Sequence, residues 1–115
     1  MKRILLAICV IALSLLSYGQ GSNERAFTFA WLSDVHLNSF AYAEDDLRQS
    51  IEDINANPDV TFTILSGDVT EFGDTKEFYL LQDILKNFRK PYFLIPGNHD
   101  VNWSENGCTM FDKIF

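Results

Sequence analysis

The sequence predicts an α/β fold with a parallel sheet, and three apolar segments are the first evidence for it. They are rich in aromatic and β-branched residues and carry no charge, as buried strands do; they span residues 27–33, 60–65 and 92–96. Two amphipathic segments separate them, which gives the order β-α-β-α-β. Crossover helices between successive strands imply parallel pairing and right-handed connections.

The first helix is expected over residues 44–55. Leu47, Ile51 and Ile54 recur at i, i+4 and i+7, so they share one face of a helix. The dipeptide Asn57-Pro58 ends the segment. Acidic residues are favoured at the positive end of a helix dipole, and we interpret the opening acids in this way rather than as metal ligands; they are Glu44, Asp45 and Asp46.

The second helix is expected to follow Asp74, which with Glu77 three residues later forms a capping box. Its apolar face is expected to contain Phe78, Leu81, Ile84, Leu85 and Phe88. Pro91 ends it. Cations are favoured near a helix C-terminus, and we expect the helix to extend far enough to include the basic residues Lys86, Arg89 and Lys90.

Residues 1–19 are expected to be a secretory signal peptide, and residues 20–115 the folded part. A basic head, Met1-Lys2-Arg3, precedes the apolar residues 4–16, and Ser17 and Gly19 are small residues at positions −3 and −1 of a cut. A membrane anchor or a buried helix is the alternative, but the run is shorter than the roughly 20 residues that span a bilayer. We therefore expect a periplasmic or secreted protein with no membrane span in its mature chain.

Charge and cysteine content limit the partners of the mature chain. Without Lys2 and Arg3, seven basic and sixteen acidic side chains remain, which is a net charge of −9. This balance argues against binding to a nucleic-acid backbone. Cys108 is the one remaining cysteine, which is unusual for an exported protein; a pairing partner would lie beyond this sequence.

A polar cluster follows each predicted strand. Asp34 and His36 follow the first strand, Asp68 the second, and Asn98 and His99 the third. Ligands of parallel α/β sheets bind at the carboxyl ends of the strands. Topology and residue chemistry therefore indicate the same edge of the sheet.

The residue types in these clusters suit a pair of metal ions. Oxygen and nitrogen ligands together favour Mn, Fe or Zn over Ca. Residues two apart on an extended segment point the same way, so Asp34 and His36 can meet one cation. Asp68 has two oxygens with which to bridge ions about 3.5–4 Å apart, and Asn98 offers an amide oxygen. Any one of these residues alone is more often a turn former or helix cap, but their coincidence at three strand ends favours a site.

His99 and Asp100 suggest acid catalysis. An imidazole beside a carboxylate can be held in one orientation and kept protonated near neutral pH, so it can donate to a leaving oxygen. Glu71, three residues after Asp68, could approach the site, but we expect it to be a solvated loop acid instead. Thr70 is expected to form a hydrogen bond near the metals.

Three segments resemble the first three motifs of the calcineurin-like metallophosphoesterases. They are Asp34-Val35-His36, Gly67-Asp68-Val69-Thr70-Glu71 and Gly97-Asn98-His99-Asp100, and the resemblance covers residues 26–104. Enzymes of this family hydrolyse phosphomonoesters or phosphodiesters with a hydroxide that bridges two divalent or trivalent metal ions. Their fold is an αββα sandwich of two mixed sheets.

The resemblance also assigns roles to the polar residues. It implies that Asp34 and His36 bind the first metal, that Asp68 bridges both, and that Asn98 binds the second. It further implies that His99 contacts the phosphate and assists the leaving group, with Asp100 orienting it.

The sequence departs from the family in its histidines. Such domains supply further histidines from a later part of the chain, whereas this sequence contains only His36 and His99. We therefore expect residues 20–115 to be the N-terminal β-α-β-α-β half of the sandwich, with the rest of the site, and a C-terminal domain, beyond it.

Activity is thus expected of the full-length protein. The 115 residues alone are expected to be weakly stable and inactive, because one sheet face would lack its partner layer. The alternative function is a non-catalytic protein that keeps a partial metal site. A dinucleotide-binding module is disfavoured because no Gly-x-Gly-x-x-Gly follows the first strand.

Overall fold

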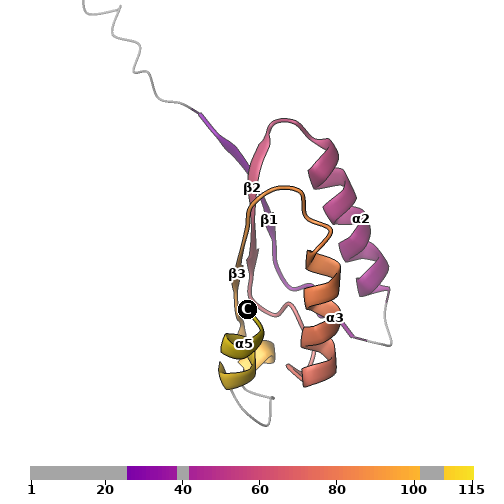
Figure 1. The fold of residues 1–115 in the computed structure, drawn as a ribbon, viewed down its shortest axis with the longest axis vertical. Coiled ribbons are helices and arrows are strands. Elements are labelled where there is room, and N and C mark those ends of the chain that lie inside the picture. Colours follow the sequence, from indigo (N-terminus) through magenta and orange to yellow (C-terminus); the bar gives the residue numbers. More distant parts are fainter. Residues whose placement is uncertain (1–25, 39–41, 102–107) are drawn as a thin grey trace, which may run out of the picture.

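The computed structural model describes residues 26–38, 42–101 and 108–115, and these contain a three-stranded parallel sheet (Figure 1). The strands lie in the order β1-β2-β3; they are β1 (Thr28–Leu32), β2 (Val60–Ser66) and β3 (Tyr92–Ile95). The register pairs Ala30 with Thr63 and Leu65 with Leu94. The predicted α/β class is confirmed.

Helices α2 (Ala43–Ala56) and α3 (Thr75–Leu85) connect the strands and lie on the same side of the sheet (Figure 1). The three acids lie in the first turn of α2, and Asn57 caps its C-terminus, as predicted. Helix α3 begins with the predicted capping box, in which the Glu77 N–H donates to Asp74 Oδ1 at 2.9 Å. Within the described residues, none of the helices has the length and apolar character to cross a membrane.

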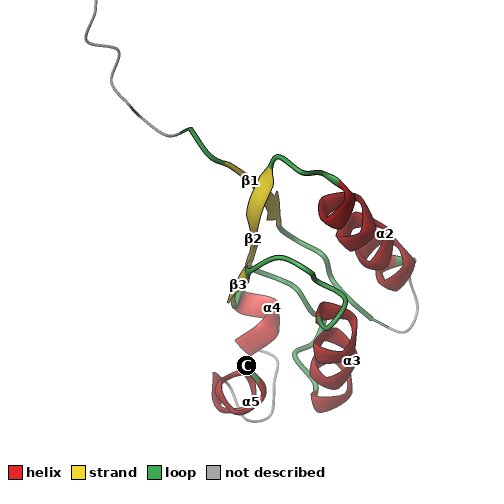
Figure 2. Cartoon of the chain, turned by 45° about the horizontal axis from the view of Figure 1, so that its top comes forward, coloured by secondary structure: helices red, strands yellow, loops and turns green. Residues whose placement is uncertain are grey.

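Two short helices follow the sheet. Two residues separate the end of β3 from helix α4 (Asn98–Val101), and α5 (Cys108–Ile114) packs against α3 and α4 (Figure 2). The polar cluster after the third strand was not predicted to be helical. Asn98, His99 and Asp100, which were expected at the tip of a strand, form the first turn of α4. This turn directs His99 and Asp100 back toward the preceding loops.

The core lies between the sheet and helices α2 and α3. Its buried members are Leu37, Leu47, Ile51, Leu65, Val69, Leu81, Ile84 and Leu85. Each such side chain contributes about 1.5–3 kcal/mol on burial. Because Leu37 and Val69 lie in the loops after β1 and β2, this core also holds the strand-end loops in place.

The opposite face of the sheet is aromatic and exposed. Phe29 of β1 stacks on Phe62 of β2 with 5.3 Å between ring centroids, and Phe62 meets Phe93 of β3 edge to face. Trp31 is 69% exposed and Phe93 is 57% exposed. This face agrees with the expectation that one side of the sheet lacks a partner layer within the described residues.

The predicted end of α3 was wrong. The helix ends at Leu85 instead of continuing to Lys90. The Asn87 side chain donates to the Ile84 carbonyl at 2.8 Å, so the last turn tightens and closes. Lys90 Nζ donates to the carbonyl oxygen of Ile54 at 2.9 Å and to that of Asn57. This cation therefore stabilises the C-terminus of α2 rather than that of α3.

Candidate metal centre

The three strand ends meet at one edge of the sheet. After β1 and β2 the chain continues as two adjacent segments joined by backbone hydrogen bonds. The Asp34 N–H donates to the Gly67 carbonyl at 3.2 Å, and the His36 N–H donates to the Asp68 carbonyl at 2.9 Å. Gly67 in turn donates to the carbonyl of Ile95 at the end of β3, at 2.8 Å. The polar clusters thus converge as the parallel topology predicted.

Three of the predicted metal ligands form one cluster. A ligand atom from each of Asp34, His36 and Asp68 lies within 4.8 Å of the other two. Asp34 is exposed and the other two are half-buried, so an ion can reach the cluster from solvent. Two carboxylates and an imidazole fit a borderline metal such as Mn, Fe or Zn. That they bind such an ion stays a prediction.

The backbone of these three residues is left-handed. The φ angles are 54° at Asp34, 49° at His36 and 49° at Asp68, and the described residues hold no other non-glycine residue with positive φ. The conformation costs about 1–2 kcal/mol per residue and persists only where the surroundings impose it. The prediction of an extended Asp34-x-His36 segment was wrong. Strain that coincides with all three clustered residues supports a functional site.

The loop after β3 packs directly on Asp68. A Cβ added to Gly97 would lie 2.3 Å from both the backbone nitrogen and Oδ1 of Asp68, so only glycine fits there. The backbone N–H of His99 donates to the same Oδ1 at 2.9 Å. Asp68 is thus held by the third strand end as well as by its own. Asn98, the remaining predicted ligand, begins α4 and is exposed; its metal-binding role stays a prediction.

Asp100 is fully buried and binds the loops together. Its Oδ1 accepts hydrogen bonds from the backbone N–H and the hydroxyl of Thr70, at 2.8 and 2.7 Å. Its Oδ2 accepts from the backbone N–H groups of Gly97 and Val69, at 2.7 and 3.2 Å. These four hydrogen bonds give Asp100 a structural function between the loops that follow β2 and β3. The orienting effect on His99 stays a prediction.

His99 lies against His36 and the loop after β2. The two rings meet edge to face with 4.7 Å between centroids. His99 Nδ1 lies 2.7 Å from the carbonyl oxygen of Glu71, and since a carbonyl only accepts, this nitrogen carries a proton. The hydrogen bond to Glu71 raises the pKa of His99 above its ordinary value; partial desolvation opposes it, and the negative charge of Asp68 adds to it.

The expectation that Glu71 is a solvated loop acid was wrong. Its Oε2 lies 2.8 Å from Nδ1 of His36, and its side chain is 27% exposed. With His36 and His99 it forms a second cluster of potential ligand atoms. The Glu71 backbone N–H donates to the carbonyl of Leu37 at 3.3 Å, so the segment that carries His36 holds Glu71 at the site. This contact joins two loops and leaves no signal in the local sequence.

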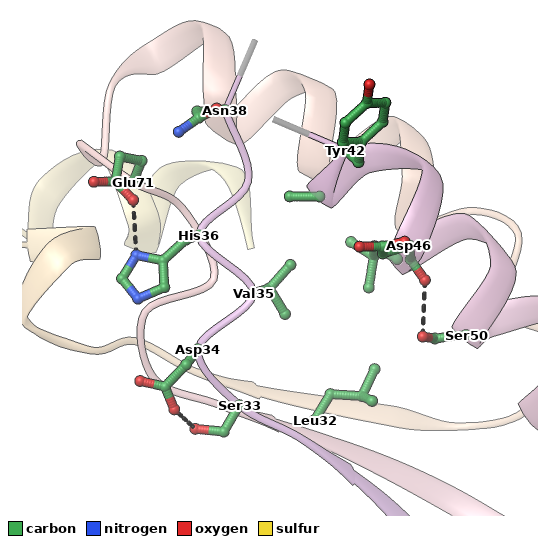
Figure 3. A pocket seen from close by; sticks show the side chains of 12 residues that line it. Leu32, Ser33, Asp34, Val35, His36, Asn38, Tyr42, Asp46, Ser50 and Glu71 are labelled. Atoms are coloured by element: carbon green, nitrogen blue, oxygen red, sulfur yellow. Dashed lines mark hydrogen bonds and ion pairs between the residues drawn. The ribbon is translucent and has the colours of Figure 1, made fainter. Parts of the chain in front are cut away.

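A cavity of about 600 Å³ lies beside the segment after β1, between this segment and the start of α2. Figure 3 shows Val35 pointing toward α2, whereas His36 points away from it toward Glu71. Asp34, His36 and Glu71 also line the cavity, so the cavity borders the ligand clusters.

The fold and the site define a class: an α/β protein with a candidate metal centre at the carboxyl edge of a parallel sheet. The family model for calcineurin-like phosphoesterases matches residues 27–114, and the chain belongs to this family.

Several curated proteins are similar to the chain. It is 31% identical over 77 residues to a probable glycerophosphodiester phosphodiesterase GpdQ of Arcobacter nitrofigilis, a match covering 60% of this chain and 28% of that protein. It is 32% identical over 91 residues to a probable cyclic nucleotide phosphodiesterase of Ruthia magnifica, with 75% and 38% covered. A glycerophosphodiester phosphodiesterase GpdQ of Enterobacter lignolyticus is 28% identical over 81 residues, with 62% and 28% covered. The chain therefore spans well under half the length of these relatives.

Proposed function

We propose that the native protein hydrolyses a phosphodiester with the aid of two metal ions bound at the carboxyl edge of the sheet. The observation that carries this proposal is the cluster of Asp34, His36 and Asp68 on left-handed backbone. Membership of the calcineurin-like phosphoesterase family supports the reaction class. The phosphodiesterase names of three relatives support a diester over a monoester.

The residues have separate tasks in this proposal. Asp34 and His36 hold the first ion, Asp68 is shared, and Asn98 contributes to the second. Bound metals of the Mn, Fe or Zn type supply positive charge and an activated water for in-line attack on phosphorus. The contacts of Asp68 with Gly97 and His99 keep the shared carboxylate in place before any ion binds.

His99 acts as the acid in this proposal. Its Nδ1 is engaged by the Glu71 carbonyl, so Nε2 is the atom from which it would donate a proton to the leaving oxygen. The raised pKa of His99 increases the protonated fraction near neutral pH. Asp100 acts on this residue through the backbone, because it fastens the turn that carries His99 to the preceding loop.

The test uses the native gene product loaded with Mn²⁺, and model substrates of both classes. We expect hydrolysis of bis-p-nitrophenyl phosphate to exceed that of p-nitrophenyl phosphate, and Asp68→Asn to lower kcat by more than about 100-fold. Asp53→Asn, the same change on the exposed face of α2, is the matched control. If the loaded wild type hydrolyses neither substrate, the enzyme proposal is refuted and the non-catalytic alternative gains support. Faster hydrolysis of the monoester would change the proposed substrate class from a phosphodiester to a phosphomonoester.

We also propose that residues 1–19, which lie outside the described part, direct export to the periplasm or the medium and are then removed. The support is the sequence pattern alone. N-terminal sequencing of the exported protein should begin at Gln20. An intact Met1 on protein in the membrane fraction would favour the anchor alternative and refute cleavage.

A further inference from the structure

We infer that Glu71 is a positioning residue that orients the two histidines of the site, His36 through its side chain and His99 through its backbone. The inference rests on the proposed metal site. Glu71 Oε2 lies 2.8 Å from His36 Nδ1, and the Glu71 carbonyl oxygen lies 2.7 Å from His99 Nδ1. Both rings therefore turn the same nitrogen, Nδ1, toward one residue.

Glu71 is itself held on both sides. Its backbone N–H donates to the carbonyl of Leu37 at 3.3 Å, in the segment that carries His36. Thr70, the preceding residue, is fully buried and bonded twice to Asp100. An acidic loop residue whose backbone is restricted in this way can hold its partner in a defined orientation, because the position of the acid is already fixed before a ligand binds.

The contact determines which nitrogen of His36 can bind a metal. A carboxylate accepts a hydrogen bond from Nδ1–H and thus stabilises the tautomer that keeps the lone pair on Nε2. Histidines that bind metals commonly donate their other N–H to a carboxylate in this way, which orients the ring and raises its basicity. His36 would then present Nε2 to an ion shared with Asp34 and Asp68.

A purely structural ion pair is the competing explanation. His36 and Glu71 are 36% and 27% exposed, and pairs on a protein surface contribute about 0–1 kcal/mol. Loss of such a pair would lower stability slightly and would leave metal affinity unchanged. Metal affinity therefore discriminates between the explanations, and the tautomer tests whether the contact orients His36.

The first test measures the tautomer in the intact, metal-free chain labelled with ¹⁵N-histidine, by long-range ¹H–¹⁵N correlation at neutral pH. The signals are assigned from His36→Asn and His99→Asn. We expect the neutral form of His36 to carry its proton on Nδ1 in the wild type, and to shift at least partly to the Nε2–H tautomer in Glu71→Gln. His99 should keep its Nδ1 proton in the variant, because the Glu71 carbonyl is unchanged; it is an internal control.

The second test measures affinity for Zn²⁺ alone by calorimetry. Loss of an orienting carboxylate typically weakens metal binding about 10–100-fold, and we expect this of Glu71→Gln. Glu52→Gln, the same charge change at an exposed position of α2, should bind as the wild type does. Circular dichroism checks folding. If Glu71→Gln does not fold, Glu71→Asp, which keeps the charge and shortens the reach, provides both measurements.

Two results would overturn the inference. One is an unchanged His36 tautomer together with unchanged Zn²⁺ affinity in a folded Glu71 variant. The other is a Zn²⁺-induced shift at Nδ1 of both histidines, which would show that Glu71, His36 and His99 bind an ion directly. A wild type that neither binds metal nor hydrolyses substrate would refute the proposed function, and the tautomer in the metal-free chain would still decide the role of Glu71.

Discussion

The Asp100→Asn substitution replaces one oxygen of a buried carboxylate that accepts four hydrogen bonds. If the amide nitrogen replaced Oδ2, the N–H groups of Val69 and Gly97 would both lose their acceptor. If it replaced Oδ1, the Thr70 hydroxyl could rotate and accept, so only the Thr70 N–H would be left without a partner. The second arrangement costs less. One lost hydrogen bond to a charged group costs about 1.5–3 kcal/mol, and the remaining bonds weaken without the charge, so we expect a loss of about 2–4 kcal/mol.

Urea unfolding of the intact protein, followed by far-UV circular dichroism, measures this loss. Domains have a total stability of about 5–15 kcal/mol, so the expected shift in midpoint is large. Asp53→Asn makes the same chemical change at an exposed carboxylate that accepts one hydrogen bond from Gln49, and it should cost less than about 0.5 kcal/mol. A loss below about 1 kcal/mol for Asp100→Asn would refute the bonding scheme on which the estimate is based.

Three further predictions concern other contacts. Gly97→Ala should weaken Mn²⁺ binding at least about tenfold in calorimetry, because the new Cβ would lie 2.3 Å from the backbone nitrogen of Asp68; unchanged affinity would contradict this close packing. Lys90→Met should lower the free energy of unfolding by about 1–2 kcal/mol, because the ammonium group donates to the Ile54 carbonyl at the end of α2; a cost near zero in urea unfolding would contradict it. Burial raises the pKa of Glu77, so the folded state favours the protonated form of its carboxyl group. The resulting contribution to the free energy of unfolding is fully present below the unfolded-state pKa of 4.5. It is lost as the pH rises through the higher folded-state pKa. Urea unfolding at pH 4 and pH 7 should therefore show Glu77→Gln gaining stability relative to the wild type at the higher pH, and a constant difference would argue against this linkage.

Local patterns predicted the secondary structure well. Leu47, Ile51 and Ile54 are buried on α2, and the capping box at Asp74 begins α3. Both signals act within one or two helical turns, so they do not depend on contacts with the rest of the chain. The end of α3 was mispredicted because Lys90 finds its acceptors on another helix, and the sequence near Lys90 contains no information about that helix.

The site was predictable only in part for a similar reason. The parallel order of the strands brings their carboxyl ends together, so the approximate meeting of Asp34, His36 and Asp68 follows from topology. The left-handed backbone of these residues and the inward turn of Glu71 depend on contacts between three loops. The burial of Asp100 depends on the same contacts, and its acidic side chain alone suggested a residue near the chemistry.

Asp100 also affects how mutational data on this protein should be interpreted. Within the segment Gly97–Asp100, substitutions at several positions should abolish activity, and a screen for activity would treat them alike. Replacement of Asp100 should reduce the amount of folded protein in the cell, since it removes the acceptor that joins two loops. Replacement of Asp68 by asparagine should leave more of the protein intact while removing a ligand. A scan that records abundance together with activity would therefore separate the residues that build the site from those that perform its chemistry.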